Sequence, residues 1–390
     1  MLTKNLFFVP STDPTALGRR LAAAAKEAPL VLEAGLGLPT LLRGPHIMAA
    51  LRDAETYSTR MFQAGILKGS LAALSGQEHQ QMRRIYNMFF TPRAVQRYEE
   101  SIVRPVATEV IAQLEGKETA DLLDEFAVSV PKRVITTLFG LPLDELEEND
   151  ARVRAMFRGI IQVQNPVAVA EGEKAFQQTL VSLASLIERE LATPGQTLLG
   201  EIIRVLKQEG IATLECCQQV VISLLLGGYE TTIWLFANAL YSLLAHPDSL
   251  ERVRRTPALL VPAIEESMRW SPSSVGTLRL VEKPVSLPDL ELAPGTPVYL
   301  ATVAMHYDES VYPSPFVYDL ERTSTPMIFG GGSHYCVGAQ LARMEARVAL
   351  SMLLDRFPRL RLDPAANPVF RYGVRESVAY GPDNLRVLLS

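Results

Sequence analysis

The sequence of 390 residues is long enough for two average domains or one large one. Hydrophobic residues make up 48% and charged residues 21%, as in ordinary globular proteins, and the net charge of −5 argues against nucleic-acid binding through phosphate neutralisation. Three cysteines leave at least one free thiol under any disulfide pairing, and the first residues lack the hydrophobic core of a signal peptide. We therefore expect a cytoplasmic protein with free thiols that binds neither nucleic acid nor membranes.

Turn signals alternate with helical stretches over the first third of the chain. From about Pro92 to Leu260 hydrophobic residues recur at helical spacing, most clearly in residues 101–115, 120–140 and 174–191. Because no internal repeat, low-complexity tract or linker-like change in composition interrupts the sequence, we expect a single domain over residues 1–390.

Residues 220–245 form the most hydrophobic helical pattern, with Glu230 as the one charged side chain. The length permits a membrane span, but a carboxylate in the middle of a span costs about 2.5–3.5 kcal/mol on insertion scales, and the sequence has no second segment of this kind. A helix that is apolar on every side also fits the interior of a large soluble domain. We therefore predict that this helix crosses the core and that Glu230 has a function.

Strand patterns are few and lie mostly after this helix. Alternation is clearest in residues 296–305 and weaker in residues 278–281 and 385–389. The expected fold class is mainly α with small β-sheets (α+β), with the minor sheet region near residues 275–305 and at the C-terminus.

The stretch FGGGSHYCVG, residues 329–338, has three consecutive glycines, which carry no side chains, in the loop before Cys336. A lone cysteine is most often a buried structural thiol. As a thiolate ligand or nucleophile, however, Cys336 would gain from close backbone N–H groups and from the dipole of the helical pattern that follows it. The sequence has no CxxC pair that would complete a zinc site and no CxxCH motif that would attach c-type haem covalently. A single thiolate, however, suits one axial bond to haem iron.

Every fixed position of this loop matches the signature Phe-Gly-x-Gly-x-His-x-Cys-x-Gly of the cytochrome P-450 superfamily, which the chain resembles from about Tyr57 to Leu389. The resemblance implies the cytochrome P-450 fold, with haem b between the long central helix and the helix that follows the cysteine loop. It makes Cys336 the axial ligand of the haem iron, packs Phe329 beside the ligand loop and brings His334 to a haem propionate.

The sequence GGYETT, residues 227–232, is similar to the oxygen-activation motif of the same family. A lone match could be a helix kink with a buried glutamate, although glycines and hydroxyls inside a helix also make room for a small ligand. The resemblance implies that Thr231 hydrogen-bonds oxygen during its activation and that Glu230 relays protons.

Two further pairs match family positions. Glu266 and Arg269, spaced i and i+3, resemble the Glu-x-x-Arg pair, which implies a role in folding and haem retention, although such a pair in isolation is usually a surface ion pair. His79 and Arg83 lie one helical turn apart, which alone would indicate a solvated face. The resemblance makes them ligands of the haem propionates together with Arg279, since arginine suits carboxylates.

The sequence also departs from the family pattern. In MHYD, His306 and Tyr307 replace Asn and Arg, and Val317 stands where an arginine often joins the Glu-x-x-Arg pair. The sequence therefore does not identify the third member of that network, which is another residue or a water. We expect His306 to form a local hydrogen bond rather than to bind a metal.

The resemblance implies a haem-thiolate monooxygenase that uses O2, two electrons and two protons to hydroxylate or epoxidise a small, mostly apolar substrate. Two alternatives stay open: a peroxide-driven peroxygenase of the same fold, against which Glu230 and Thr231 argue, and a non-catalytic haem-thiolate sensor or binding protein. Cyclisation or C–C coupling also stays open, because the scaffold fixes only the oxidant.

No dinucleotide-binding glycine fingerprint occurs in the sequence, so we expect electrons from a separate ferredoxin or flavodoxin with its NAD(P)H reductase. We predict a monomer whose partner docks on the Cys336 side, near Arg83, Arg84, Arg343 and Arg347.

By analogy with the family, the substrate pocket is expected to draw on residues 58–74, 224–228 and 274–278, including Leu224, Gly227, Gly228, Val275 and Leu278. These segments carry Arg60 and Lys68 as their charged residues and are otherwise mainly apolar or small. They favour a neutral terpenoid, steroid, fatty-acid or polyketide-like substrate.

Overall fold

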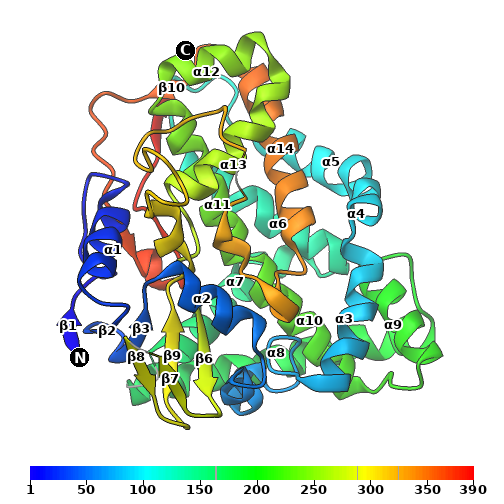
Figure 1. Ribbon diagram of the computed structural model, residues 1–390. Helices are drawn as coiled ribbons and strands as arrows, with labels where there is room; N and C mark the ends of the chain where they lie inside the picture. Colours follow the sequence, from blue (N-terminus) through cyan, green and yellow to red (C-terminus); the bar gives the residue numbers. More distant parts are fainter. Residues whose placement is uncertain (163–164, 288, 324) are drawn as a thin grey trace.

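The computed structural model describes residues 1–162, 165–287, 289–323 and 325–390, and Figure 1 shows its ribbon. Helices occupy most of the chain, as predicted, and fill residues 92–260 almost without interruption. The helices are α1 (Ala16–Glu27), α2 (Gly44–Arg52), α3 (Gly76–Phe90), α4 (Pro92–Tyr98), α5 (Arg104–Ala112), α6 (Ser129–Phe139), α7 (Leu146–Ile161), α8 (Pro166–Ala192), α9 (Leu198–Gln208), α10 (Leu214–Gly228), α11 (Glu230–Leu244), α12 (Pro247–Arg255), α13 (Leu260–Trp270) and α14 (Ala339–Arg356).

Short strands form small sheets beside this helical bulk, so the predicted fold class is confirmed. The largest sheet has the order β1-β2-β3-β9-β6-β4 and mixes parallel and antiparallel pairs. The strands are β1 (Leu2–Lys4), β2 (Leu30–Glu33), β3 (Leu38–Leu41), β4 (Tyr57–Ser58), β5 (Thr119–Asp121), β6 (Thr277–Val281), β7 (Val285–Leu287), β8 (Leu290–Leu292), β9 (Pro297–Leu300), β10 (Arg361–Leu362), β11 (Phe370–Tyr372), β12 (Tyr380–Pro382) and β13 (Arg386–Leu388).

The strand predicted at residues 296–305 is only half correct. β9 ends at Leu300, and a 3-10 helix, η7 (Thr302–Tyr307), follows. Every residue of η7 is buried, and a short run that is buried on all sides shows the same hydrophobicity whether it is strand or helix. The sheet also recruits β1 to β3 from the N-terminus, which the sequence did not predict.

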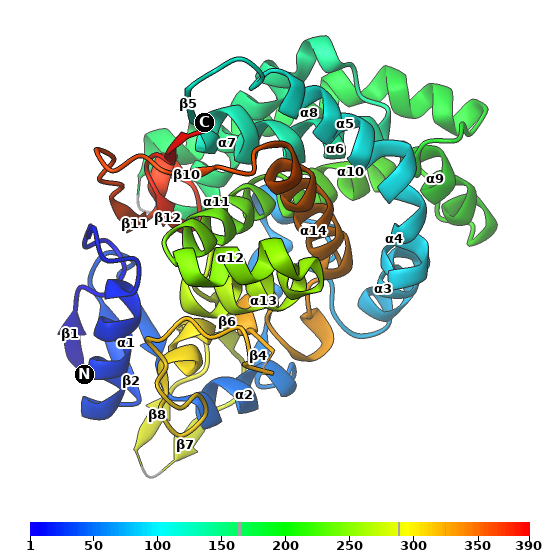
Figure 2. The same ribbon diagram turned by 90° about the horizontal axis from the view of Figure 1, so that it is seen from above.

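The long hydrophobic helix predicted at residues 220–245 lies in the core, but it is two helices. α10 ends at Gly228 and α11 begins at Glu230, with Tyr229 at φ −77° and ψ −75° between them. By length and composition the 214–244 segment could cross a membrane, yet 78% of its most hydrophobic stretch is buried inside the protein. Seen from above, α11 lies in the middle of the helical part, next to α12, α13 and α14 (Figure 2).

The buried apolar residues form two clusters. One fills the helical part, and the other lies between α1, α2 and the largest sheet. Tyr241 of α11 and Ile328, which precedes the cysteine loop, pack against both clusters. The cysteine loop is thus set between the sheet and the helices.

Candidate active site

Two glycines of the cysteine loop are required for different structural reasons. Gly330 has φ 70° and ψ −153°, a combination that is almost restricted to glycine. Gly332 also has positive φ, and a Cβ there would lie 1.9 Å from the carbonyl oxygen of Leu51 in α2. The loop closes where the Cys336 N–H donates to the Phe329 carbonyl at 2.9 Å. Glycine therefore allows the loop to turn tightly against α2 and to present the cysteine.

Cys336 lies three residues before α14, as predicted. Burial raises the pKa of its thiol, whereas backbone N–H groups of Gly338 and Ala339 and the guanidinium groups of Arg83 and Arg343 lower it. A thiolate at this position would thus receive hydrogen bonds from the start of α14 and lie in a positive field.

A cavity of about 300 Å3 lies in front of Cys336. Apolar side chains and the glycine backbone form much of its wall, and the described lining residues include no Asp or Glu. They are Thr59, Phe62, Leu71, Ala72, His79, Arg83, Ser223, Ser274, Gly276, Thr277, Arg279, Thr302, Ile328, Phe329, Gly330, Gly331, His334, Tyr335, Cys336 and Val337. All six residues that the sequence assigned to cofactor binding are therefore brought together around one cavity.

Among the described residues, no Asp or Glu pairs with Arg83 or Arg279, the two arginines of this cavity. Arg279 is 5% exposed, burial lowers its pKa to about 10, and its guanidinium donates to Thr277 Oγ1 at 3.0 Å and to the Leu278 carbonyl at 2.7 Å. The His79 and His334 rings lie 4.4 Å apart.

The two histidines of the cavity indicate which kind of ligand it binds. Within the described part of the chain, His79 Nε2 is buried without a hydrogen-bond partner. Burial and neighbouring positive charge lower the pKa of His334 to about 4. Such groups gain most from a ligand that carries carboxylates. Together with one sulfur and a side-chain-poor loop, they fit a flat cofactor with two carboxylates and a single axial ligand.

Thr231 lies at the start of α11, beside the break at Tyr229. Its hydroxyl donates to the Gly227 carbonyl at 2.7 Å, a side-chain bond that competes with the helix ladder and so accompanies the break. Gly227 and Thr231 are both exposed, and they continue at i+4 spacing the helix face of Ser223, which lines the cavity. This face of the α10–α11 junction is therefore open toward the cofactor side.

Glu230, although adjacent in sequence, lines a different cavity of about 300 Å3. The side chain is 4% exposed, and no described residue hydrogen-bonds its Oε2 atom. Burial, followed by the charge of Asp150, raises its pKa to about 8. Asp150 pairs with Lys132 Nζ at 2.5 Å and with Arg154 Nη2 at 2.7 Å, and these three residues share the cavity wall with Glu230. The raised pKa of Glu230 thus favours the protonated carboxyl near neutral pH, beside a cavity with paired charges.

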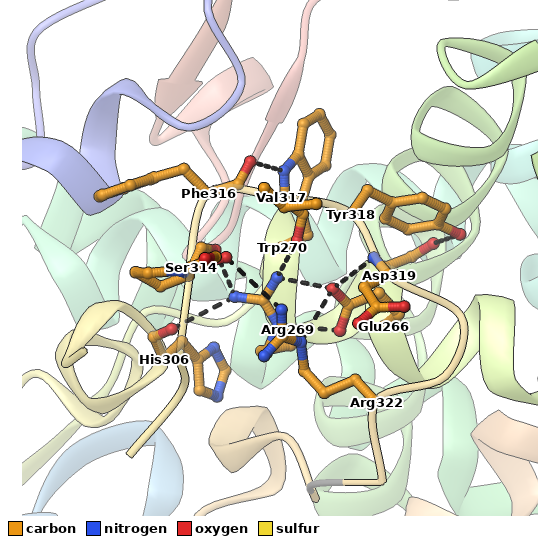
Figure 3. A network of polar contacts seen from close by, with 12 residues as sticks. Glu266, Arg269, Trp270, His306, Ser314, Phe316, Val317, Tyr318, Asp319 and Arg322 are labelled. Carbon is orange, nitrogen blue, oxygen red and sulfur yellow. Dashed lines mark hydrogen bonds and ion pairs between the residues drawn. The ribbon is translucent and has the colours of Figure 1, made fainter. Parts of the chain in front are cut away.

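The Glu266–Arg269 pair is buried, as the sequence resemblance implied (Figure 3). Arg269 Nη2 and Nε donate to the two carboxylate oxygens at 2.6 and 2.8 Å. The guanidinium also donates to the carbonyl groups of His306, Pro315 and Val317 at 3.2, 2.6 and 3.0 Å. Every N–H direction of the buried guanidinium is thereby used.

Arg322 supplies the third member of this network, which the sequence left open at Val317. Its Nε lies 3.3 Å from Glu266 Oε1, and the Asp319 N–H donates to the same oxygen at 3.0 Å (Figure 3). Val317 contributes its carbonyl while its side chain is 56% exposed. The sequence did not reveal Arg322, because it lies five positions beyond the usual arginine.

The predicted local hydrogen bond of His306 is present: its Nε2 accepts the Met327 N–H at 2.6 Å. Tyr307, the second departure from the family pattern, stacks on Phe316 and donates to the Trp270 carbonyl at 3.2 Å. Both residues are therefore buried and hydrogen-bonded to the backbone.

Neighbours of the predicted substrate-pocket residues line the cavity of Cys336. The expected segments 58–74 and 274–278 contribute to its wall, with Thr59, Phe62, Leu71, Ala72, Ser274, Gly276 and Thr277, whereas the expected segment 224–228 contributes no residue and its neighbour Ser223 does. The predicted residues Leu224, Gly227, Gly228, Val275 and Leu278 are not part of that wall, and their contact with substrate stays a prediction.

Comparisons with known proteins agree with this geometry. A model of the Cytochrome P450 family matches residues 258–384. The chain is 57% identical over 387 residues to the C-19 steroid 1alpha-hydroxylase of Sorangium cellulosum (strain So ce56), which covers 99% of this chain and 98% of that protein. Among solved structures, Sorangium cellulosum So Ce56 cytochrome P450 260B1 superposes with a TM-score of 0.95 at 49% identity, covering 100% of this chain and 99% of the other. CYP109E1 from Bacillus megaterium in complex with testosterone superposes with a TM-score of 0.88 at 25% identity, covering 97% and 100%.

Fold, cavity and donor set define a haem-binding oxygenase. The chain belongs to the cytochrome P450 family. It is a haem-thiolate monooxygenase of the bacterial type that hydroxylates a small apolar substrate, and its cofactor is haem b.

Proposed function

We propose that this monooxygenase hydroxylates a C-19 steroid, with Cys336 as the axial ligand of the haem iron. The identity of 57% over almost the entire length of a C-19 steroid 1alpha-hydroxylase carries the proposal of the substrate. The cavity supports it, because apolar side chains such as Phe62 and Leu71 stand beside the hydroxyls of Ser223, Ser274 and Thr302. Such a wall suits a rigid hydrocarbon skeleton with a few oxygen substituents.

Residues around the cavity hold the cofactor and tune its ligand. His79, Arg83, Arg279 and His334 would hold the two propionates, with the positive charge supplied by the two arginines, and the N–H groups at the start of α14 would donate to the Cys336 sulfur. With this thiolate bound, haem supplies the oxygen-activating chemistry, because the sulfur donates electron density that favours O–O cleavage.

Protons reach the cofactor side through the α10–α11 junction. Glu230 holds a proton at Oε2, since its pKa is raised to about 8, and it exchanges with the solvent through the cavity of Asp150 and Arg154. Rotation of the Glu230 side chain past the break at Tyr229 brings the proton to Thr231, whose hydroxyl passes it on and positions oxygen. The two residues are consecutive in α11, with Glu230 buried and Thr231 exposed.

The electrons come from a separate ferredoxin or flavodoxin with its NAD(P)H reductase, and the protein works as a cytoplasmic monomer. The partner docks on the Cys336 side, near the four arginines predicted from the sequence. Three of them are in ion pairs: Arg84 with Glu209 at 2.8 Å, Arg343 with Glu265 at 2.6 Å, and Arg347 with Glu99. The Arg84–Glu209 pair is largely exposed and therefore weak, so an acidic partner can compete for the Arg84 guanidinium.

Ligand titration tests the substrate. Testosterone should shift the ferric haem from low to high spin at lower concentration than corticosterone or myristic acid, and turnover with a ferredoxin system should yield a monohydroxylated steroid. Tighter binding and turnover of myristic acid would contradict the steroid proposal. Product formed from hydrogen peroxide alone at an equal rate would instead indicate a peroxygenase.

Two substitutions test the ligand and the docking face. Cys336→Ser should abolish the red-shifted Soret band of the reduced carbon monoxide complex, and retention of that band would exclude Cys336 as the ligand. Arg84→Glu together with Arg343→Glu should slow reduction by the partner. Because the Arg343 guanidinium lies 4.4 Å over the Phe329 ring, the single variant Arg84→Glu separates docking from disturbance of the ligand loop. An unchanged reduction rate would contradict the docking site.

A further inference from the structure

His306 joins two parts of the molecule that are far apart in the sequence. It lies in η7, is fully buried, and its carbonyl accepts Arg269 Nη1 at 3.2 Å in the Glu266–Arg269 network (Figure 3). Its imidazole Nε2 accepts the backbone N–H of Met327 at 2.6 Å. One residue therefore contacts the buried ion pair through its backbone and the chain before the cysteine through its side chain.

Met327 begins the segment that forms the ligand loop. It opens the short helix η8 (Met327–Phe329), its carbonyl accepts the Gly330 N–H at 3.1 Å, and the Phe329 carbonyl accepts the Cys336 N–H at 2.9 Å. The hydrogen bond of His306 thus holds the start of the loop that the Cys336 N–H closes on the Phe329 carbonyl.

We propose that His306 is a positioning residue for the Cys336 ligand loop, with its imidazole acting as the acceptor that fixes Met327 against the Glu266–Arg269 network. The inference rests on the proposed role of Cys336 as the iron ligand. A backbone donor so close to a buried histidine needs an acceptor, and a hydrophobic side chain at position 306 would leave that N–H without one.

The environment keeps the imidazole in the accepting form. Burial, and then the charge of Arg269, lowers the pKa of His306 to about 3, so the ring is neutral near pH 7. Because Nε2 accepts a hydrogen bond, the proton of the neutral ring is on Nδ1, for which the described residues offer no partner. The acceptor is thus present over the working pH range, and asparagine, common at this position in the family, is shorter and would not reach as far.

Three variants of the holoprotein test the role. His306→Leu removes the acceptor, and His306→Gln restores one near the position of Nε2. His246→Leu is the matched control, because His246 is also a histidine in this region, stacked on Tyr318 at 4.5 Å and bonded to the Ser242 carbonyl at 2.7 Å, but no contact joins it to Met327.

The readouts are transfer of haem to a haem-free acceptor protein, the share of red-shifted Soret band in the reduced carbon monoxide complex, and the melting temperature of the haem-free protein. Loss of a residue that orients a metal ligand typically weakens the site 10- to 100-fold. His306→Leu should therefore release haem roughly 10-fold faster or more and lose much of the red-shifted band. His306→Gln should stay close to wild type in both, and His246→Leu should lower only the melting temperature.

A second pair of variants tests the same hydrogen bond by changing its donor residue, Met327. Met327 follows Pro326 (φ −66°, ψ 144°) as the first residue of η8, a position that tolerates proline. Met327→Pro deletes the donor and leaves His306 in place, while Met327→Leu keeps the N–H. If the bond positions the loop, Met327→Pro should reproduce the effects of His306→Leu, and the double variant should be no worse than either one. Should His306→Leu not fold, Met327→Pro gives the same answer.

The results distinguish the assignment of Cys336 as the iron ligand from the positioning role of His306. If the wild-type protein lacks the red-shifted band, the assignment of Cys336 fails. If the wild type shows the band but His306→Leu and Met327→Pro retain it and release haem no faster, only the positioning role is wrong. Equal loss of the band in His246→Leu would likewise overturn it, because the effect would then come from general destabilisation.

Discussion

Two cavities of about 300 Å3 each lie near the α10–α11 junction, and their charges are arranged in opposite ways. In the cavity of Cys336, the guanidinium groups of Arg83 and Arg279 lie in a wall whose described residues include no Asp or Glu. In the cavity of Glu230, Asp150 holds Lys132 and Arg154 in close ion pairs. The first site leaves its positive charge unbalanced, whereas the second balances its charges internally.

This difference assigns different tasks to the two cavities. Unpaired buried cations are costly, and they persist where a ligand of opposite charge completes them. Charges that already form ion pairs with one another need no ligand. They can exchange protons with a neighbouring carboxyl whose pKa lies near neutrality. The first cavity is thus suited to bind the cofactor, and the second is the one through which we propose that protons are taken up.

The largest expected effect comes from removing a cation of the first cavity. Arg279→Leu should leave a buried propionate without its partner, which costs about 3 kcal/mol or more and should weaken haem retention by at least about 100-fold. Haem content after purification and the rate of haem transfer to an acceptor protein measure this. Arg60→Leu is the matched control, because Arg60 forms a partly exposed pair with Glu282 and should have little effect. Equal haem retention in both variants would show that the first cavity does not need its cations.

Substitution of the carboxyl in the second cavity should impair proton delivery while haem stays bound. Glu230→Gln should lower kcat about 100-fold or more, the usual contribution of a positioned acid, and should increase the solvent isotope effect. Glu345→Gln is the control: Glu345, in α14, is also buried and its pKa is also raised to about 8, but it lines neither cavity. If both variants lose activity equally, the loss reflects a buried amide and not a proton route.

Asp150→Asn should have a smaller effect on rate and a visible effect on the pH profile. After burial, the charge of Asp150 is the main cause that raises the pKa of Glu230. Without this charge, and with Lys132 and Arg154 released, the pKa of Glu230 should fall. The alkaline limb of the kcat profile, where the donor loses its proton, should therefore move to lower pH. A profile that stays in place would show that the two carboxyls are not coupled.

How far the sequence predicted this arrangement depends on the distance between partners along the chain. The cysteine loop, the helix after it and the strand β6 were predicted correctly, because each is encoded in a few consecutive residues. The break between α10 and α11 was only an alternative, as a kink at GGYETT, because a single uninterrupted hydrophobic pattern spans both helices.

Partners from distant segments could not be predicted. Arg322 reaches Glu266 from 56 residues away, and Asp150 reaches the cavity of Glu230 from another helix, α7. In the sheet, Thr40 pairs with Tyr299 in a strand too short to show alternation. Tertiary packing creates these contacts, and no local spacing indicates them.

The smallest predicted effect is on stability, and it tests whether Glu230 is truly neutral when folded. Burial raises its pKa from 4.5 to about 8, so between these values the folded protein holds a proton that the unfolded chain releases. Its contribution to stability is complete below about pH 4.5 and is lost as the pH rises toward 8, with a slope of at most about 1.4 kcal/mol per pH unit. Glu230→Gln should remove this slope from urea unfolding curves measured across that range, as Glu345→Gln should remove its own. An unchanged slope in Glu230→Gln would mean that Glu230 is already ionised beside Lys132 and Arg154. In that case the second cavity would store charge without holding the proton, and the contrast with the first cavity would no longer explain how protons reach the cofactor.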